Sequence, residues 1–338
     1  MKINSFIACL LAAIATLAVG ASSASSAEPV KIRTGWINVP SGLVPVIFKK
    51  DGIARHLGRS YTLESTRFIA STTALTALAN GELDIAVLGF PAVGFAIENA
   101  GMEDLRIVAD ETPDGVKDHY SVQFFVRNDG PTKPNELKGK VLATNGQGST
   151  VDIAMRLMMR KHGLEYPRDY TIIEAPLPTQ KGLLLDKKAD LIISLPPFCY
   201  DPELLKNARP LFTQKDSLGI SELAVWAAKA DVLKTKRAAL VDFFEDYLRG
   251  LQWYADPTNR QEAIRIISDF TKVPAANFES WLFTEKDFYR EPTAKPDLAA
   301  LQRNIDATAE LGFLKKKIDI RKYTDLTLMD DALKRLKQ

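Results

Sequence analysis

Hydrophobic positions along the chain follow two periods, one typical of strands and one typical of helices. Residues 28–36 (EPVKIRTGW) alternate apolar and polar side chains, which predicts a strand, and residues 61–68 predict another. Further strands are predicted at 83–89, 106–110, 121–129, 136–144, 170–175, 189–195 and 221–229. Helical spacing predicts helices at 43–50, 71–80, 91–99, 151–162, 180–185, 235–255, 260–270, 275–282 and 298–311. Strands that alternate with helices indicate an α/β fold with parallel sheets covered by helices.

One unit of this pattern occurs twice. The segment NGELDIAVLGFP spans 80–91, and KKADLIISLPPF spans 187–198. A shift of 106 positions brings Asp84 onto Asp190. Both copies read as the end of a helix, a tight turn, an apolar strand and a loop. Because open α/β sheets bind ligands at the carboxyl ends of their strands, two such lobes facing each other predict a cleft between them.

The composition is typical of a globular protein and leaves two domains possible in 338 residues. The net charge of +2 argues against a nucleic-acid-binding protein, which normally carries a basic excess. Residues 1–27 combine a basic start, an apolar run and small residues before Ala27, which predicts a signal peptide cleaved after Ala27. The alternative is an uncleaved anchor, but the run is shorter than a comfortable membrane span. Cys199 is then the only cysteine of the exported chain, so no disulfide forms within it.

Two helix starts are candidate anion sites. The loop NGQGST ends with Gly148, Ser149 and Thr150 at a predicted helix N-terminus, where free N–H groups and the helix dipole favour an anion. Ser71 and Thr72 begin the corresponding helix of the first half. The alternative for both positions is an ordinary N-cap without a ligand.

Other candidates lie in the loops at predicted strand ends. Gly89 and Phe90 close the strand of the first repeat and are expected to line the cleft. The aromatic side chains of Trp36, Phe198 and Trp226 are expected to form an apolar wall, since pockets are mostly apolar with a few placed polar groups. The alternative for each ring is a place in the core.

Other polar residues fit structural roles better. Asp84 and Asp190 each begin a strand at the end away from the cleft, so we expect them to form structural hydrogen bonds. Cys199 is expected to be an inert thiol, and the histidines at 56, 119 and 162 lack metal-ligand spacing. We therefore predict no catalytic set, no metal site and no cofactor.

In their order and spacing, the leader, the GELDIAVLG core, the ELKGKVLATNGQGST box and ADLIISLPP resemble periplasmic substrate-binding proteins of ABC importers. The resemblance is to the nitrate, sulfonate, taurine and thiamine-precursor type, and it covers the whole mature chain. It implies a type II two-lobed fold, with 28–120 and 225–338 in one lobe and 121–224 in the other, joined by crossings near 118–123 and 219–225. Lys187 departs from the glycine common there, and Pro196-Pro197-Phe198 replaces a tryptophan near a proline, which puts the ligand in doubt.

The resemblance implies a monomeric periplasmic protein that binds a small organic anion and delivers it to the transmembrane subunits of a permease. One alternative is a thiamine-pyrimidine precursor protein, either for binding or for biosynthesis. The other is a periplasmic receptor that feeds a sensor. The biosynthetic enzymes have a segment rich in histidine and cysteine that this sequence lacks.

Overall fold

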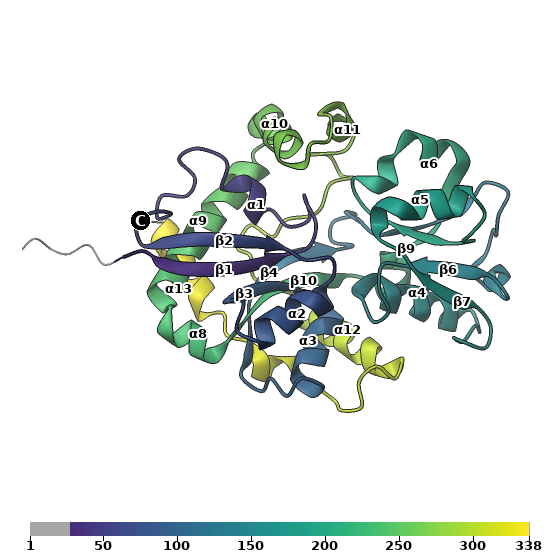
Figure 1. Ribbon diagram of the computed structural model, residues 1–338, viewed down its shortest axis with the longest axis horizontal. Coiled ribbons are helices and arrows are strands. Elements are labelled where there is room, and N and C mark those ends of the chain that lie inside the picture. Colours follow the sequence, from purple (N-terminus) through teal and green to yellow (C-terminus); the bar gives the residue numbers. More distant parts are fainter. Residues whose placement is uncertain (1–27, 338) are drawn as a thin grey trace, which may run out of the picture.

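The computed structural model describes residues 28–337, which form two lobes side by side (Figure 1). The predicted signal peptide lies outside the described residues. The strands are β1 Val30–Trp36, β2 Tyr61–Arg67, β3 Ile85–Gly89, β4 Leu105–Asp114, β5 Gln123–Arg127, β6 Val141–Thr144, β7 Thr171–Glu174, β8 Ile192–Ser194, β9 Ala208–Thr213 and β10 Ser221–Lys229. Within 28–337, no helix is both long and apolar enough to span a membrane.

Helices cover the strands in both lobes. The α-helices are α1 Val44–Ile47, α2 Ser71–Ala79, α3 Phe90–Glu98, α4 Thr150–Lys161, α5 Leu177–Leu185, α6 Pro202–Asn207, α7 Gln214–Leu218, α8 Ala230–Thr235, α9 Arg237–Ala255, α10 Arg260–Thr271, α11 Ala276–Glu279, α12 Leu298–Glu310 and α13 Thr327–Leu336. Short 3₁₀ turns lie at Pro134–Leu137, Phe198–Tyr200, Pro257–Asn259 and Ile320–Tyr323.

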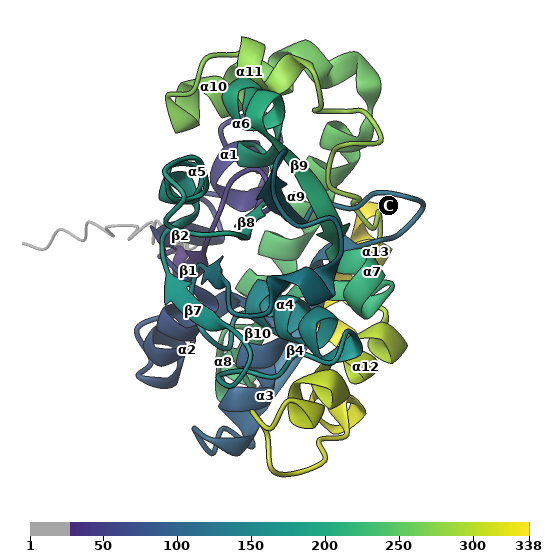
Figure 2. The same cartoon turned by 90° about the vertical axis from the view of Figure 1, so that its right-hand side faces the viewer.

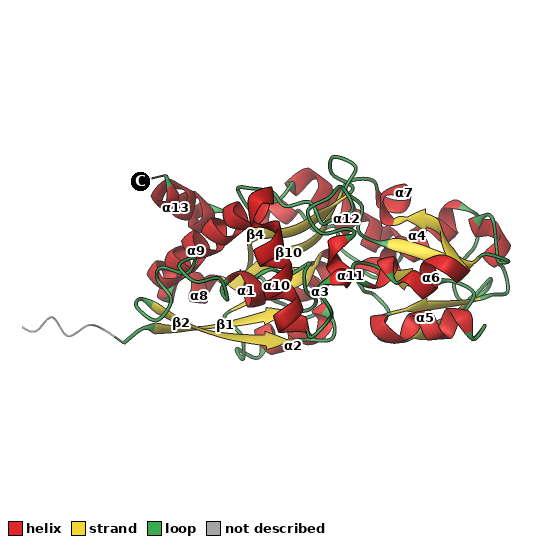
Figure 3. Ribbon diagram, turned by 90° about the horizontal axis from the view of Figure 1, so that it is seen from above, coloured by secondary structure: helices red, strands yellow, loops and turns green. Residues whose placement is uncertain are grey.

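The first lobe is built on a five-stranded sheet with the order β2-β1-β3-β10-β4. Its strands β1, β2 and β3 are parallel, while β10 runs antiparallel to β3 and to β4. One apolar cluster packs α9, α10 and α13 against one face, and a second packs α2, α3 and α12 against the other. Figure 3 shows this lobe from above, with β1 and β2 along one side and β4 and β10 further across the sheet.

The second lobe repeats this arrangement. Strands β8, β5 and β9 form one antiparallel sheet, and β6 pairs with β7 in parallel. A bridge between Leu142 and Leu191 places β6 beside β8, so the spatial order is β7-β6-β8-β5-β9. Figure 2 looks onto this lobe, in which α4 and α5 belong to separate apolar clusters. The predicted two-lobed α/β fold is confirmed, with mixed sheets because β5 and β10 run against their neighbours.

Some elements differ from the sequence prediction. The predicted helix 235–255 is α9, which begins at Arg237, whereas the short helix α8 just before it was not predicted. The predicted helix 43–50 is a single turn, α1. Strand β4 continues past residue 110 to Asp114, through a polar stretch that the hydrophobic pattern does not mark. The carboxyl groups of that stretch are buried between the lobes' connecting strands, which explains why the pattern misses it.

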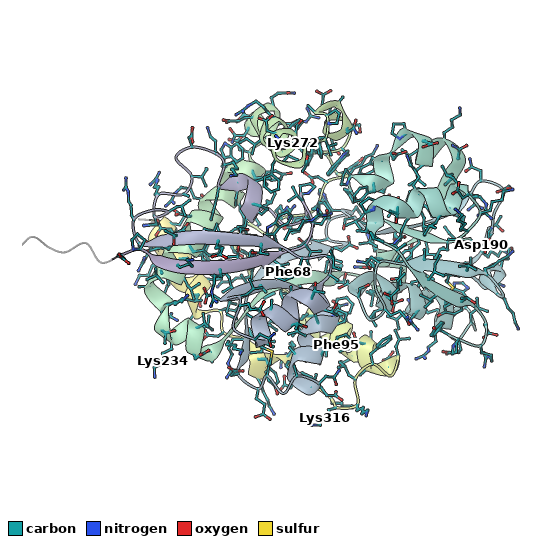
Figure 4. All side chains as sticks on the ribbon, in the orientation of Figure 1. Phe68, Phe95, Asp190, Lys234, Lys272 and Lys316 are labelled. Atoms are coloured by element: carbon teal, nitrogen blue, oxygen red, sulfur yellow. The ribbon has the colours of Figure 1, made fainter. Side chains whose placement is uncertain are left out.

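The two repeated aspartates form equivalent clamps. Asp84 accepts hydrogen bonds from the main-chain N–H of Arg33 (2.8 Å) and from the guanidinium Nη2 of the same arginine (2.7 Å). It also accepts one from Lys236 Nζ (2.8 Å). Asp190 accepts from the N–H of Val141 (3.1 Å) and from Arg127 Nη2 (3.2 Å). Burial raises the pKa of Asp84, but the bonds from Arg33 and Lys236 outweigh it and hold the pKa below its usual value. The predicted structural role of both aspartates is confirmed, and Figure 4 shows Asp190 at the outer end of its lobe.

We predict that Asp84→Ala lowers the free energy of unfolding by about 3 kcal/mol, because it leaves two cations beside a buried site without a counter-charge. Asp190→Ala is the matched control and should cost less, since its side chain is 20% exposed whereas that of Asp84 is 1% exposed. Urea unfolding of both variants measures the difference. An equal loss in the two variants would contradict a special role for the buried clamp.

Buried acids gather on the two strands that lead to and from the second lobe. Asp110, Glu111 and Asp114 lie on β4, and Glu222 lies on β10, all nearly inaccessible to solvent. Burial raises the pKa of Glu222 to about 7, and burial together with the charge of Glu222 raises that of Asp110 well above its usual value. Oε1 of Glu222 accepts a hydrogen bond from the main-chain N–H of Asp297 (2.6 Å). Asp110 and Glu222 therefore bind protons more tightly in the folded protein than in the unfolded chain.

A carboxyl group that binds its proton more tightly when folded stabilises the protein below its folded pKa and less as pH rises through that value. We predict that the melting temperature of the wild type falls between pH 5 and pH 8, and that Glu222→Gln reduces this fall. The change from a pKa of 4.5 to about 7 corresponds to about 3 kcal/mol at most. Calorimetry across this pH range measures the melting temperatures of the wild type and of Glu222→Gln. Substitution of an exposed acid, Glu285→Gln, is the control. Parallel curves for wild type and Glu222→Gln would refute the prediction.

Candidate functional site

A cavity of about 110 Å³ lies between the two lobes at the carboxyl ends of the repeated strands. It is smaller than the pockets of roughly 300–1,000 Å³ that hold drug-sized ligands. Its wall comes from both lobes: Ile37, Asn38, Ser41, Gly42, Ala70, Ser71, Val87, Gly89, Glu111, Thr112, Asn145, Ser149, Thr150, Val151, Leu177, Leu195, Leu223 and Ala224. The cavity thus suits a small solute that touches both lobes at once.

Two helices from different lobes begin at this wall. Helix α2 starts at Ser71, and α4 starts at Thr150. The first N–H groups of a helix have no partner within it, so both starts present donors and a partial positive charge. Ser149 caps α4 by accepting from the N–H of Asp152 (3.3 Å), and it donates to Asn145 Oδ1 (2.8 Å). The N-cap alternative is therefore correct for Ser149, and it coexists with a place on the cavity wall.

The lobes touch beside this polar patch. The hydroxyl of Thr150 lies 3.4 Å from the carbonyl oxygen of Leu223 on the connecting strand β10. A Cβ built on Gly89 would lie closer than 3.0 Å to Thr150 Oγ1, and 3.2 Å from Ser71 Oγ. Gly89 has φ −63° and ψ 152°, a conformation open to any residue. A side chain is excluded there by the approach of α4 and not by the backbone.

Glu111 is the charged residue on the wall. Its Oε2 accepts hydrogen bonds from Trp226 Nε1 and from the hydroxyl of Tyr247 (2.8 Å), and its Oε1 accepts from the N–H of Leu43 (3.2 Å). Burial raises the pKa of Glu111 above its usual value, because it outweighs the opposing effects of Arg290 and of these three donors. Sequence analysis missed Glu111 because it lies in the polar stretch DETPD, just past the strand predicted at 106–110.

The ten predicted site residues fall into three groups. Ser71, Gly89, Ser149 and Thr150 line the cavity. Thr72 and Gly148 line a smaller opening beside it, between α2 and the loop before α4. The four aromatic residues do not line the cavity; they are Trp36, Phe90, Phe198 and Trp226.

The expected aromatic wall is replaced by aliphatic side chains, and each ring has another place. Phe90 is fully buried in the core under α3, and Trp226 packs edge-on against Phe243 and Phe244. The ring of Trp36 lies 5.8 Å from that of Phe270. Phe198 starts a 3₁₀ turn and is only partly buried. Strand β10 is irregular here, with register shifts against β4 on both sides of Ala224, so Leu223 and Ala224 both line the cavity while the ring of Trp226 enters the core.

The one possible metal-ligand group among residues 28–337 lies away from this cavity. His56 meets Asp242 and Glu245 of α9, with ligand atoms within 4.8 Å of one another. Their separation in sequence hid this group from spacing arguments. Both acids are already paired, Glu245 with Arg249 (2.6 Å) and Asp242 with Arg335 (2.5 Å), so the group forms an ion-pair network.

Solved structures share this fold. The periplasmic aliphatic sulphonate binding protein SsuA from Escherichia coli matches with a TM-score of 0.69 and 18% identity, covering 88% of this chain and 92% of that one. The periplasmic nitrate-binding protein NrtA from Synechocystis PCC 6803 matches with a TM-score of 0.72 and 17% identity, covering 92% and 90%. The desulfurization enzyme DSZB matches with a TM-score of 0.66 and 13% identity, covering 90% and 99%. No curated protein sequence matches this chain.

These identities establish the fold, and the sequence establishes the family. Residues 25–268, more than half of the chain, match the NMT1-like family. Together the matches confirm the resemblance to periplasmic substrate-binding proteins that the sequence indicated. The chain belongs to the NMT1-like family and has the two-lobed fold of periplasmic binding proteins.

Proposed function

We propose that this protein is the extracytoplasmic solute-binding component of an ABC importer. It captures a small organic anion, such as a sulfonate or a carboxylate, between its lobes and delivers it to the transmembrane subunits of a permease. It works as a monomer in the periplasm after removal of residues 1–27. Residues 28–120 and 225–338 move as one lobe, and residues 121–224 move as the other.

One observation carries this proposal: the N-termini of α2 and α4, from different lobes, border the same cavity. An anion placed there receives main-chain and hydroxyl donors from both lobes, so it stabilises their contact. A ligand that bridges two lobes shifts them towards the closed form in a hinge motion. The closed form is then the signal that the permease recognises.

Capture fits the cavity better than catalysis does. Its wall includes no cysteine, histidine or lysine among residues 28–337, so the groups that most often activate a nucleophile are not in contact with a bound solute. Cys199 is buried, and burial raises the pKa of its thiol far above the usual value, which leaves it unreactive. The likeness to DSZB therefore extends to the fold and gives no reason to propose turnover here.

The experiment is a thermal-shift screen of nitrate, small sulfonates and small carboxylates, followed by small-angle scattering with the best ligand. A ligand that binds only the folded protein raises its melting temperature, and saturation at about 100 times Kd adds about 2.7 kcal/mol of stability. We expect a shift with at least one anion and a smaller radius of gyration at saturation. Binding without any compaction would contradict closure around the ligand.

We predict that Gly89→Ala lowers the affinity for that ligand at least tenfold. The added methyl group meets Thr150 when the lobes approach, and such overpacking costs typically 1–3 kcal/mol. The melting temperature without ligand should change little, because the clash is relieved when the lobes separate. Calorimetric titration measures the affinity.

The matched control is Gly146→Ala, in the loop before α4, where a Cβ meets no atom within 4 Å. It should bind the ligand as the wild type does. If both glycine variants keep the wild-type affinity, the contact between Gly89 and Thr150 is not part of the ligand-bound state.

A further inference from the structure

The cavity wall carries groups of opposite electrical character. Helix starts and hydroxyl groups occupy part of it, through Ser71, Ser149 and Thr150. On β4, Glu111 places a carboxyl group on the same wall, and the wall includes no lysine, arginine or histidine among residues 28–337. An anion alone would use the donors and leave this carboxyl group without a partner in the ligand.

The hydrogen bonds around Glu111 hold it as an acceptor. Three donors point at its two oxygens, from Trp226, Tyr247 and the N–H of Leu43, which suits an ionised carboxylate with about four acceptor positions. Oε2 accepts two of these bonds and Oε1 accepts one. Oε1 also lies 3.4 Å from where a Cβ of Gly42 would be, and Gly42 itself lines the cavity. An acceptor position therefore remains on Oε1, and Glu111 itself lines the cavity.

The cation closest to this site is shared among several acids. Arg290 acts on Glu111, and its charge also opposes the pKa rise that burial causes in Asp110 and Asp287. Its guanidinium donates to the main-chain oxygens of Pro40 and Ser41, and it does not line the cavity. A cation in the cavity would lower the cost of burying Glu111, the one acid on the wall among residues 28–337.

The wall also contains an unused donor. Asn38 lines the wall, and its side-chain Nδ2 is buried without a hydrogen-bond partner among the described residues. A buried donor without an acceptor costs free energy, which a ligand acceptor would recover. This observation is independent of the helix starts and indicates an oxygen-bearing group on the ligand.

We propose that the ligand is a small zwitterion, with an ammonium-type donor bound by Glu111 and an anionic group bound at the starts of α2 and α4. The inference rests on the proposed capture of an anion and specifies its chemical class. The aliphatic wall of Val87, Leu177, Leu195 and Leu223 contacts a short carbon chain between the two groups. The size of the cavity limits that chain to a few carbon atoms.

The test compares matched ligands on the wild-type protein by calorimetric titration. Taurine is paired with ethanesulfonate, and β-alanine is paired with propanoate, so that each pair differs by one amino group. We expect the amino member to bind at least tenfold more tightly in at least one pair. Because this comparison needs no substitution, it does not depend on the folding of a variant.

Glu111→Gln should remove this preference by weakening the amino member and not its partner. The matched control is Glu222→Gln, which neutralises another buried acid that does not line the cavity and should keep the preference. If Glu111→Gln keeps the preference, the assignment of Glu111 is wrong.

The remaining outcomes separate the two proposals. If ethanesulfonate or propanoate binds as tightly as its amino partner, the ligand is not a zwitterion, while the capture of an anion stands. If none of the four compounds binds, the zwitterion is refuted. If the wider screen of anions also gives no ligand, the proposed function fails with it.

Discussion

The fold depends on an aspartate in each lobe that ties the start of one strand to the main chain of the strand beside it. In each lobe an aspartate at the end of a turn accepts the N–H of a neighbouring strand and pairs with at least one cation. This fixes the register of two parallel strands at their outer ends, because one carboxylate serves both the main chain and a side chain. The opposite ends are then free of such ties. Loops and helix starts can gather there, and the cavity lies where they meet.

The strands that join the lobes combine a mechanical and a chemical role. Strand β4 carries Asp110 and Asp114 along the connection, and between them it presents Glu111 to the cavity. Trp226 on β10 fixes Glu111 from the side, so both connecting strands determine where that carboxyl group lies. A change in how β4 and β10 twist would therefore move a wall residue. In this way, the position of the lobes and the shape of the site are coupled through shared strands.

The sequence predicts much of the fold because its period is strong where one face is apolar. Residues such as Ile85 and Leu88 in an apolar run, or the helix after Thr150, leave little ambiguity. The polar parts of the site, Ser71, Gly89, Ser149 and Thr150, could be found because strand ends and helix starts have sequence signals. The direction of an aromatic ring has no such signal: Trp226 and Phe90 are near the site in sequence, but their rings are fully buried in the core. Glu111 was missed because a buried acid is recognised only from its partners, which come from 68, 115 and 136 residues away.

The two repeated helices, α2 and α5, differ in the chemistry of their first residues. Helices α2 and α5 begin and end 106 positions apart, and the turn after each places Gly81 and Lys187 in the left-handed region, with φ 74° and 60°. With this constant spacing Ser71 corresponds to Leu177, and both border the cavity. The start of the repeated helix is therefore polar in one lobe and apolar in the other, so an unsymmetrical ligand meets different surroundings in its two orientations.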